Sequence, residues 1–338
     1  MSARYEQNNA LIKEFKERLF RLSSENVNQY AIELFKFQSK HNQIYRHYLE
    51  NLRIDYHSIN RVEEIPFLPI RFFKEQKVVV SSDLLQETVF KSSGTGGERS
   101  QHFVHDVAFY LKHAQRLFEA SYGAFEDYHI LALLPSYIAQ GDSSLVAMVD
   151  HFIRLSHSDI SGFYLESLEE LHHALQRAVR SGRKVIVWGV TYALLDFVEQ
   201  YSLSYPDLIV METGGMKGRR KEMTREEVHQ RLTAGFGVAQ IHSEYGMTEM
   251  LSQAYSMGKG IFQSSLALQL SVRQINDPFQ SVATGKQGIL KVMDLANIES
   301  CAFIETQDLG IQHEDNSFEV IGRVDNSDIR GCSLMYRF

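Results

Sequence analysis

The segment Lys91–Ser100 has the composition of an anion-binding loop. It reads KSSGTGGERS and directly follows a run with high strand propensity. Glycines let backbone N–H groups approach a ligand closely, and hydroxyl side chains add further donors, so such a loop can cradle a phosphate. The segment matches neither GxxxxGK[ST] nor GxGxxG, and the same composition also occurs in plain tight turns. On composition alone, a phosphate loop and a structural turn both remain open.

A second polar segment, His242–Glu249, follows an apolar run and is expected at the carboxyl end of a strand. A carboxylate there can hold Mg²⁺, a hydroxyl can contact a phosphate or a carboxylate, and a tyrosine ring can stack on a base. The alternative is an ordinary strand-to-helix turn, in which Thr248 or Glu249 only helps a helix to begin.

Two further polar segments lie near the end of the chain. Ile304–Gly310 contains Asp308, and the segment from Ile321 to Gly331 contains Arg323. We expect both side chains in turns that follow short strands. There they can bind sugar hydroxyls, or they can cap turns and form a surface ion pair.

The hydrophobic pattern predicts the elements that position these segments. Residues 3–52 contain no glycine or proline and have apolar residues at helical spacing, which predicts two helices. Residues 65–80 carry two prolines and then a β-branched run, which predicts a loop leading to a strand. From Glu87 to about Gly258, strand-like and helix-like runs alternate, as in βαβ units around a mostly parallel sheet, where ligands bind beyond the carboxyl ends of the strands.

After Gly258 short strand-like runs alternate with Gly, Asp and Asn turns, which predicts a small antiparallel or barrel-like sheet. The expected fold class is therefore α/β with a β-rich end. The expected parts are a helical prefix over residues 1–80, an α/β body over 81–258 and a β-rich subdomain over 259–338.

Composition and charge exclude several classes of protein. With 338 residues, 44% hydrophobic and 23% charged, the chain is neither a disulfide-stapled module nor disordered. Its net charge of −7 argues against nucleic acid as a partner. The polar N-terminal residues and the lack of any run of about 18 apolar residues predict a cytoplasmic protein without membrane insertion.

Cysteine and histidine spacing gives little support for a metal site. Cys301 and Cys332 are the two cysteines, and they form no CxxC pair, so a structural zinc site is not expected. His102 and His105 form an HxxH pair, but no third ligand is evident, and a core or helix-start role is favoured over zinc.

In their order and spacing, four segments resemble the serial core motifs of the adenylate-forming enzymes, which include acyl- and aryl-CoA synthetases, peptide-synthetase adenylation domains and luciferases. These segments are SSGTGGERS, YGMTE, TQDLG and GRVDNSDIRG. Within that superfamily the chain looks most like the acyl-protein synthetases of bacterial luminescence. It is similarly short, has a helical prefix, ends soon after the GRxD segment and carries a near-terminal cysteine, Cys332. The resemblance covers most of the chain and is weakest over residues 1–80. Gly96 stands where the family commonly has a second threonine, and the usual lysine does not follow.

This resemblance implies the fold of an adenylate-forming N-terminal domain, with the mobile C-terminal domain truncated after its hinge and the body binding a nucleotide. It also implies an activity that uses ATP and Mg²⁺. A carboxylic acid, here a fatty acid, becomes an acyl-adenylate with release of pyrophosphate, and the acyl group then passes to a protein cysteine. An acyl-reductase or acyl-carrier protein is the implied partner. Two alternatives stay open: a ligase that transfers the acyl group to coenzyme A or a carrier protein, and a non-catalytic nucleotide-binding subunit.

Carried over residue by residue, the resemblance implies roles for individual positions. Tyr245, followed by Gly246, would stack near adenine, Thr248 would contact phosphate or the substrate carboxylate, and Glu249 would hold Mg²⁺. Asp308 would accept hydrogen bonds from the ribose, with Arg323 beside it. The loop that would wrap the β- and γ-phosphates comprises Ser92, Ser93, Gly94, Thr95, Gly96 and Gly97, and the glycine turn facing the nucleotide comprises Gly214 and Gly215.

Two catalytic assignments are less direct. The family's catalytic lysine lies in the mobile domain, so Lys217 of the KGRRK run is a candidate replacement, although such runs are more often solvated loops. Cys332 is the candidate acyl acceptor, because the nearby Arg330 favours a thiolate, and the alternative is a small buried residue. Cys301 lies in an apolar run and is predicted to be structural.

Overall fold

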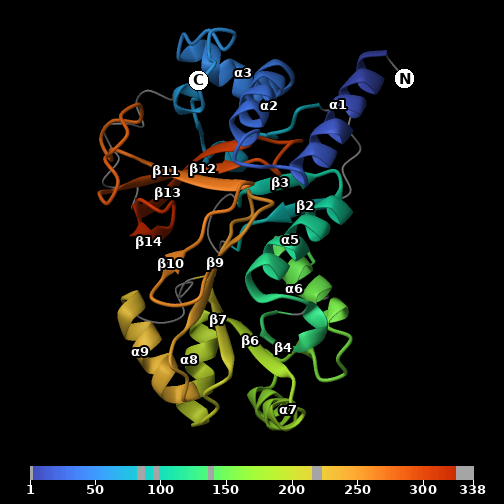
Figure 1. Cartoon of the computed structure of the whole chain (residues 1–338), viewed down its shortest axis with the longest axis vertical. Helices are drawn as coiled ribbons and strands as arrows, with labels where there is room; N and C mark the ends of the chain where they lie inside the picture. The colour runs from blue at the N-terminus through green and yellow to red at the C-terminus, as the bar shows by residue number, and fades with distance from the viewer. Residues whose placement is uncertain (1–2, 82–87, 94–98, 136–140, 215–222, 325–338) are drawn as a thin grey trace. The chain divides into compact units, whose positions relative to one another are not determined.

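The computed structural model of the chain describes residues 3–81, 88–93, 99–135, 141–214 and 223–324 (Figure 1). Contacts divide the chain into two compact units, which we describe separately. Unit 1 contains the residues up to Tyr110, the short segment Thr248–Ser252 and the residues from Gln263 onward. Unit 2 contains Leu111–Met247 and Gln253–Phe262. The three-part division at residues 80 and 258 stays a prediction. It divides the chain in sequence order, whereas each compact unit contains more than one segment of the chain.

The N-terminal part of unit 1 is helical. Its elements are α1 (Ala3–Leu19), α2 (Val27–His41), α3 (Gln43–Asn51), the 3₁₀ turn η1 (Val62–Glu64) and the short helix α4 (Phe72–Glu75). The sequence predicted two helices where the structure has three. Asn42 has an extended backbone and its side chain accepts a hydrogen bond from Tyr45 N, so it ends α2 and caps the start of α3.

The predicted strand at the end of the proline-containing stretch is wrong. Val78, Val79 and Val80 are buried but belong to no strand, and only Val80 N donates to a distant backbone carbonyl, that of Glu299. The strand of this region is instead β1 (Leu68–Pro69), which pairs parallel to β13. The three valines are therefore apolar because they are buried, and not because they form a strand.

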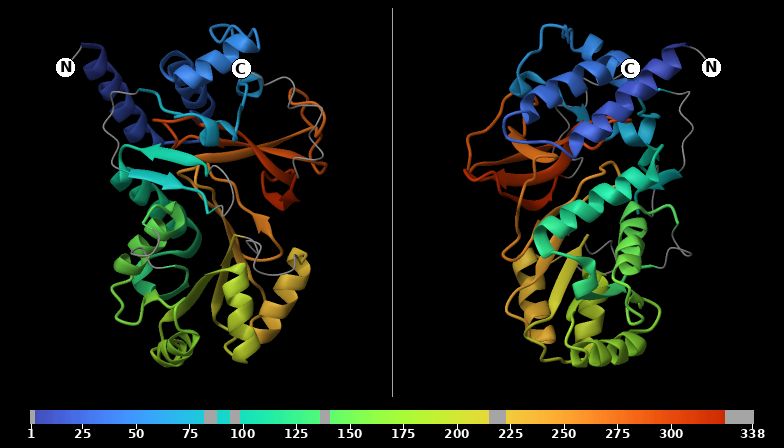
Figure 2. Two further views of the ribbon diagram at one scale, coloured as in Figure 1. Left: turned by 180° about the vertical axis from the view of Figure 1, so that it is seen from behind. Right: turned by 45° about the vertical axis from the view of Figure 1, so that its right-hand side comes forward.

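The rest of unit 1 is an antiparallel sheet. The strands are β11 (Leu268–Arg273), β12 (Gln287–Asp294), β13 (Phe303–Gln312) and β14 (Phe318–Arg323), in the order β14-β13-β12-β11. A separate hairpin pairs β2 (Thr88–Lys91) with β3 (Gln101–Val104). Helix α2 lies against the loop after β12, where Tyr30 Oη donates to Leu295 O at 3.4 Å and Gln38 Nε2 to Asn297 O at 2.7 Å (Figure 2). The predicted antiparallel C-terminal sheet is confirmed.

Unit 2 is built around a mostly parallel sheet, as the alternating pattern predicted. The strand order is β5-β4-β6-β7-β8-β9, parallel except for the antiparallel pair β8 and β9. The strands of this sheet are β4 (Tyr128–Leu133), β5 (Gly162–Phe163), β6 (Lys184–Val190), β7 (Ile209–Thr213), β8 (His242–Tyr245) and β9 (Ala254–Ser256). Unit 2 also contains the short strand β10 (Ile261–Phe262), which does not belong to this sheet. Its helices are α6 (Ser144–Leu155), α7 (Leu168–Arg180), α8 (Thr191–Gln200), α9 (Arg225–Phe236) and the 3₁₀ turn η2 (Phe125–Asp127), and α5 (Val107–Tyr122) runs into it from unit 1.

The core of unit 2 lies between this sheet and its helices. Helices α6 and α7 pack on β4, and α8 packs on β6 and β7 (Figures 1 and 2). Trp188 on β6 is fully buried, with its ring centroid 5.9 Å from that of Phe152 and 6.2 Å from those of Phe118 and Tyr255. These aromatic rings pack together in the core of unit 2.

In the part of the chain that the structure describes, no helix is both long enough and apolar enough to span a membrane.

Candidate functional site

In unit 1 the turn that carries Thr248 and Glu249 is held from its far end by a buried aspartate. Asp294 is fully buried and accepts hydrogen bonds from Leu251 N at 2.7 Å and Ser252 N at 3.1 Å. It also accepts one from Ser252 Oγ at 2.6 Å. No helix follows Glu249, and the next element is strand β9, so the alternative in which these residues start a helix is wrong.

Glu249 lies in the protein interior, only 5% exposed. Burial raises the pKa of this carboxyl, while a hydrogen bond from the Ser100 side chain and the charge of Arg323 act in the opposite direction. Asp308 also contributes to raising this pKa, because like charges disfavour ionisation. A buried carboxylate with these neighbours can gain stability from a cation, since the cation would offset the cost of its charge.

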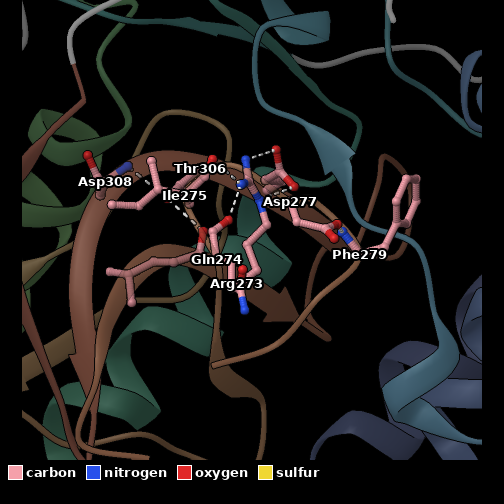
Figure 3. Close-up of polar contacts among 9 residues, drawn as sticks. Arg273, Gln274, Ile275, Asp277, Phe279, Thr306 and Asp308 are labelled. Atoms are coloured by element: carbon pink, nitrogen blue, oxygen red, sulfur yellow. Dashed lines mark hydrogen bonds and ion pairs between the residues drawn. The ribbon is translucent and has the colours of Figure 1, made fainter. Parts of the chain in front are cut away.

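Asp308 and Arg323 lie opposite one another on adjacent strands, β13 and β14. Arg323 Nε lies 3.4 Å from Asp308 Oδ1, and the aspartate side chain is 12% exposed while that of arginine is 65% exposed. The prediction that both residues lie in turns is therefore wrong, because pairing on both sides keeps β13 extended through Gln312. Figure 3 shows Thr306 and Asp308 along this strand; Thr306 Oγ1 accepts from Asp308 N at 3.0 Å and donates to Leu290 O at 2.8 Å.

The base of the glycine-rich segment is closed by the β2–β3 hairpin. Ser92 N donates to Ser100 O at 3.1 Å, and Ser100 N donates to Ser92 Oγ at 3.0 Å. Arg99 Nε donates to Ser92 O. Ser93 is exposed at the point where the described residues end. Because Ser100 also bonds to Glu249, the base of the segment and the Thr248–Glu249 turn are joined. The predicted loop residues Gly94, Thr95, Gly96 and Gly97 lie outside the described residues.

In unit 2 the polar residues gather at the carboxyl ends of the parallel strands β7 and β8. Thr213 on β7 is in register with Glu244 on β8, and its hydroxyl donates to that carboxylate. Thr191, which begins α8, has its hydroxyl 2.5 Å from Glu212 Oε1 and also close to Gly214 O. Gly214 has a positive φ of 69°, a conformation that favours glycine. Gly215 and Lys217 lie outside the described residues.

Glu244 is a site residue that the sequence analysis did not single out. It is 8% exposed, and burial together with the charge of Glu212 raises its pKa to about 7, against the hydrogen bond from Thr213. At Gly246, two residues further on, a Cβ would lie 2.5 Å from Glu244 Oε1, so a side chain there would displace this carboxylate oxygen. The only signal in the sequence was the position of Glu244 at a strand end.

Tyr245 is more buried than its predicted role beside a base suggests. It is 8% exposed, and its ring centroid lies 5.8 Å from that of Phe262 within unit 2. The chain passes from unit 2 to unit 1 between Met247 and Thr248, so the YGMTE motif contributes residues to both units.

The two cysteines differ in what the structure describes of them. Cys301 is fully buried, and burial raises the pKa of its thiol to about 12, so the prediction of a structural role agrees with its surroundings. Cys332 lies outside the described residues. Across the described stretches of residues 3–324, no three His, Cys, Asp or Glu residues are grouped so that they could hold a metal ion.

Most of this chain matches a known protein family. Residues 11–127 and 137–337 match the family described as acyl-protein synthetase, LuxE. A long-chain-fatty-acid–luciferin-component ligase from Aliivibrio fischeri is 23% identical over 336 residues, which is 89% of this chain and 85% of that protein. A ligase of the same name from Photorhabdus luminescens is 36% identical over 71 residues, or 21% of this chain and 60% of that protein.

Solved structures share the fold at low identity. A 2-hydroxyisobutyryl-CoA ligase in complex with 2-HIB-AMP and CoA superposes with a TM-score of 0.63 at 12% identity, covering 90% of this chain and 70% of that one. ATP-bound MatB from Rhodopseudomonas palustris superposes with a TM-score of 0.54 at 17% identity, covering 72% of this chain. The match spans only about half of MatB, 49% of its length. These likenesses establish the fold of adenylate-forming ligases.

The resemblance inferred from four short motifs is thus confirmed by a match that spans most of the sequence and by the fold. The chain belongs to the acyl-protein synthetase family, LuxE.

Proposed function

We propose that the protein activates a carboxylic acid with ATP and Mg²⁺ and then transfers the acyl group to a protein cysteine thiol. One observation of unit 1 carries this proposal. Three residues from distant parts of the sequence interact in one cluster. They are Ser100 at the base of the glycine-rich segment, Glu249 in the Thr248–Glu249 turn and Asp308 on β13. They belong to three of the four motifs that suggested the family.

The chemistry follows from the poor reactivity of a carboxylate. It is a poor acyl donor, because its oxygen is a poor leaving group. Attack of the carboxylate oxygen on the α-phosphorus of ATP forms a mixed anhydride with AMP and breaks the bond to pyrophosphate. The thiolate then attacks the anhydride carbonyl, forming a thioester and releasing AMP. In both steps the protein mainly positions the reactants and offsets charge.

Unit 1 would contact the phosphates, the metal and the ribose. Mg²⁺ commonly binds through one or two carboxylates together with substrate phosphates, so a single buried Glu249 is a suitable ligand. When bound, the ion neutralises phosphate charge. Thr248 would contact phosphate or the acid, and Asp308 would accept hydrogen bonds from the ribose. The proposed phosphate loop runs over residues 92–97.

Tyr245 and Gly246 are proposed to contact the base, and the glycine turn Gly214–Gly215 is proposed to face the nucleotide. Lys217 is the proposed cation that stabilises charge during adenylation, and Cys332 is the proposed acyl acceptor. Both residues rest on the family resemblance and on their place in the sequence.

The names of the relatives suggest the substrate. Both are called long-chain-fatty-acid ligases, so a fatty acid is the proposed acid. The proposed partner is an acyl-reductase or acyl-carrier protein that receives the acyl group. A cytoplasmic location stays a prediction.

The test is carboxylate-dependent exchange of pyrophosphate into ATP, with acids from short to long chain plus aryl and amino acids. We expect exchange with fatty acids and a loss of at least about 100-fold in Glu249→Gln, which keeps the shape of the side chain but removes its charge. Glu319→Gln on β14 is the matched control and should retain activity. ATP binding without exchange for any acid would point to a non-catalytic subunit, and full activity of Glu249→Gln would refute the site assignment.

The acceptor is tested with radioactive acid and ATP. Label on the protein that Cys332→Ser abolishes supports transfer to this cysteine. Label that persists on the protein in Cys332→Ser would refute Cys332 as the acceptor, and label that appears on added coenzyme A would favour the CoA-ligase alternative.

A further inference from the structure

Two buried side chains hold the backbone carbonyls of the Thr248–Glu249 turn. His102, on β3, is 1% exposed, and its Nδ1 lies 2.9 Å from Thr248 O. Asn297, in the loop after β12, is fully buried, and its Nδ2 donates to Glu249 O at 2.7 Å. The carbonyls of two consecutive residues are thus fixed from two different elements of unit 1.

The chemistry of the His102 contact defines the state of the ring. A carbonyl oxygen can only accept, so Nδ1 must carry the proton. Burial lowers the pKa of His102 to about 4, although the Thr248 carbonyl and the Asn297 side chain both favour the charged ring.

Asp294 already supplies the contacts that hold the far end of the turn, at Leu251 and Ser252. His102 and Asn297 act at the other end, on the two residues that carry the proposed phosphate and metal contacts. The ring of His102 is itself fixed by an edge-on contact with Phe73, with centroids 5.8 Å apart. The contacts of Asp294 therefore hold one end of the turn, and those of His102 and Asn297 hold the other end.

We propose that His102 and Asn297 are positioning residues, which hold Thr248 and Glu249 in the geometry needed to bind Mg·ATP and to activate the acid. This inference rests on the proposed function. Residues that orient a metal ligand commonly change metal affinity or activity by 10- to 100-fold when they are replaced.

The test compares His102→Leu with His102→Asn and His105→Leu. Asparagine keeps an N–H donor on the atom bonded to Cγ, where Nδ1 sits in histidine, whereas leucine removes it. His105 is the matched control: it is 8% exposed, and neither ring nitrogen bonds to any residue that the structure describes. Two quantities are measured, namely the Mg²⁺ concentration for half-maximal pyrophosphate exchange and the dissociation constant of Mg·ATP by calorimetry.

We expect His102→Leu to raise both quantities by about 10-fold or more, with His102→Asn within about threefold of wild type and His105→Leu unchanged. A merely structural role would lower the folded fraction and leave both quantities unchanged for the folded protein, which would overturn the inference. If His102→Leu does not fold, Asn297→Ala tests the same turn from the other side and must show the same shift. Absence of exchange in the wild type would instead refute the proposed function.

Discussion

Glu244 is a carboxyl group whose ionisation the fold opposes. Because its pKa is raised to about 7, the folded state holds its proton more tightly than the unfolded state does. The raised pKa of Glu244 therefore adds to the free energy of unfolding. This contribution is fully present below the unfolded pKa, near 4.5, and is lost as pH rises through about 7. We expect Glu244→Gln to leave stability nearly unchanged at pH 4.5 and to raise the free energy of unfolding by about 3 kcal/mol at pH 8.5.

Urea unfolding at several pH values measures this difference. Glu63→Gln serves as the control, because Glu63 is exposed and its partner, Arg61, is an arginine and not a histidine. A wild-type stability that does not fall between pH 5 and pH 8 relative to Glu244→Gln would contradict the assignment of a raised pKa to this residue.

Cys301 gives a second prediction at the residue scale. Its thiol is fully buried, has a pKa near 12 and donates to Phe303 O at 3.5 Å, so it should react with thiol reagents only after unfolding. We expect native protein treated with iodoacetamide to carry no label on Cys301 within minutes, while protein in urea is labelled fully. Peptide mass spectrometry reads out the site. Cys301→Ala should still accept acyl label, and loss of acylation in that variant would make Cys301 the acceptor.

At the scale of elements, β13 joins the candidate site to a buried ion pair. Arg273 Nε and Nη2 each donate to a carboxylate oxygen of Glu305 at 2.8 Å. Nη1 of Arg273 donates to the carbonyls of Gln274 and Ile275, at 2.5 and 3.0 Å (Figure 3). Glu305 lies three residues before Asp308 on the same strand.

Removal of one partner of this pair leaves the other charge buried. We therefore expect Glu305→Leu to lower the free energy of unfolding by about 3–5 kcal/mol, and the double variant Arg273→Met, Glu305→Leu to recover most of it. Urea unfolding measures both. Glu63→Ala, which breaks the exposed pair with Arg61, should change stability little. A Glu305→Leu protein as stable as the wild type would show that the pair contributes no stability.

Regular elements were predictable from the sequence because each has its own period. Within the region predicted to alternate, the apolar run KVIVWGV forms β6 and the amphipathic run Val107–Tyr122 forms α5. Asp308 was misassigned because TQDLG carries the Gly and Asp typical of turns, while the pairing that keeps it extended comes from β12 and β14. Local composition cannot report contacts that distant strands supply.

The contacts that hold the candidate site were predictable only in part. Thr248 and Glu249 were found through their motif, but Asp294 at the end of β12 and Asn297 in the loop after it are distant in sequence and follow no motif or spacing. His102 was noticed as a metal candidate and judged a core residue, and the structure places it in the core with a specific partner, Thr248. Residues that hold a turn in this way are defined by tertiary contacts, which the local sequence does not report.

At the scale of the whole molecule, the chain crosses repeatedly between the two units, and Asp308 and Tyr245 are two of the residues proposed to contact the nucleotide. Asp308 belongs to unit 1 and Tyr245 to unit 2. Ligand binding to the folded state raises stability by RT ln(1 + [L]/Kd), which is about 2.7 kcal/mol at 100 times Kd and corresponds to a few degrees in Tm. If both contacts exist, weakening either one must reduce the stabilisation of the whole chain.

We therefore expect saturating Mg·ATP to raise the Tm of the wild type by a few degrees and to raise that of Asp308→Ala and of Tyr245→Leu by clearly less, each compared with its own ligand-free value. Phe262→Leu is the control for Tyr245, because it removes the ring that Tyr245 packs against without removing the proposed stacking partner of the base. Calorimetric melting measures the shifts. A full ATP shift in Tyr245→Leu would show that Tyr245 makes no contact with the nucleotide. A loss in Phe262→Leu equal to that in Tyr245→Leu would mean that the packing of Tyr245, and not its contact with the nucleotide, sets the shift.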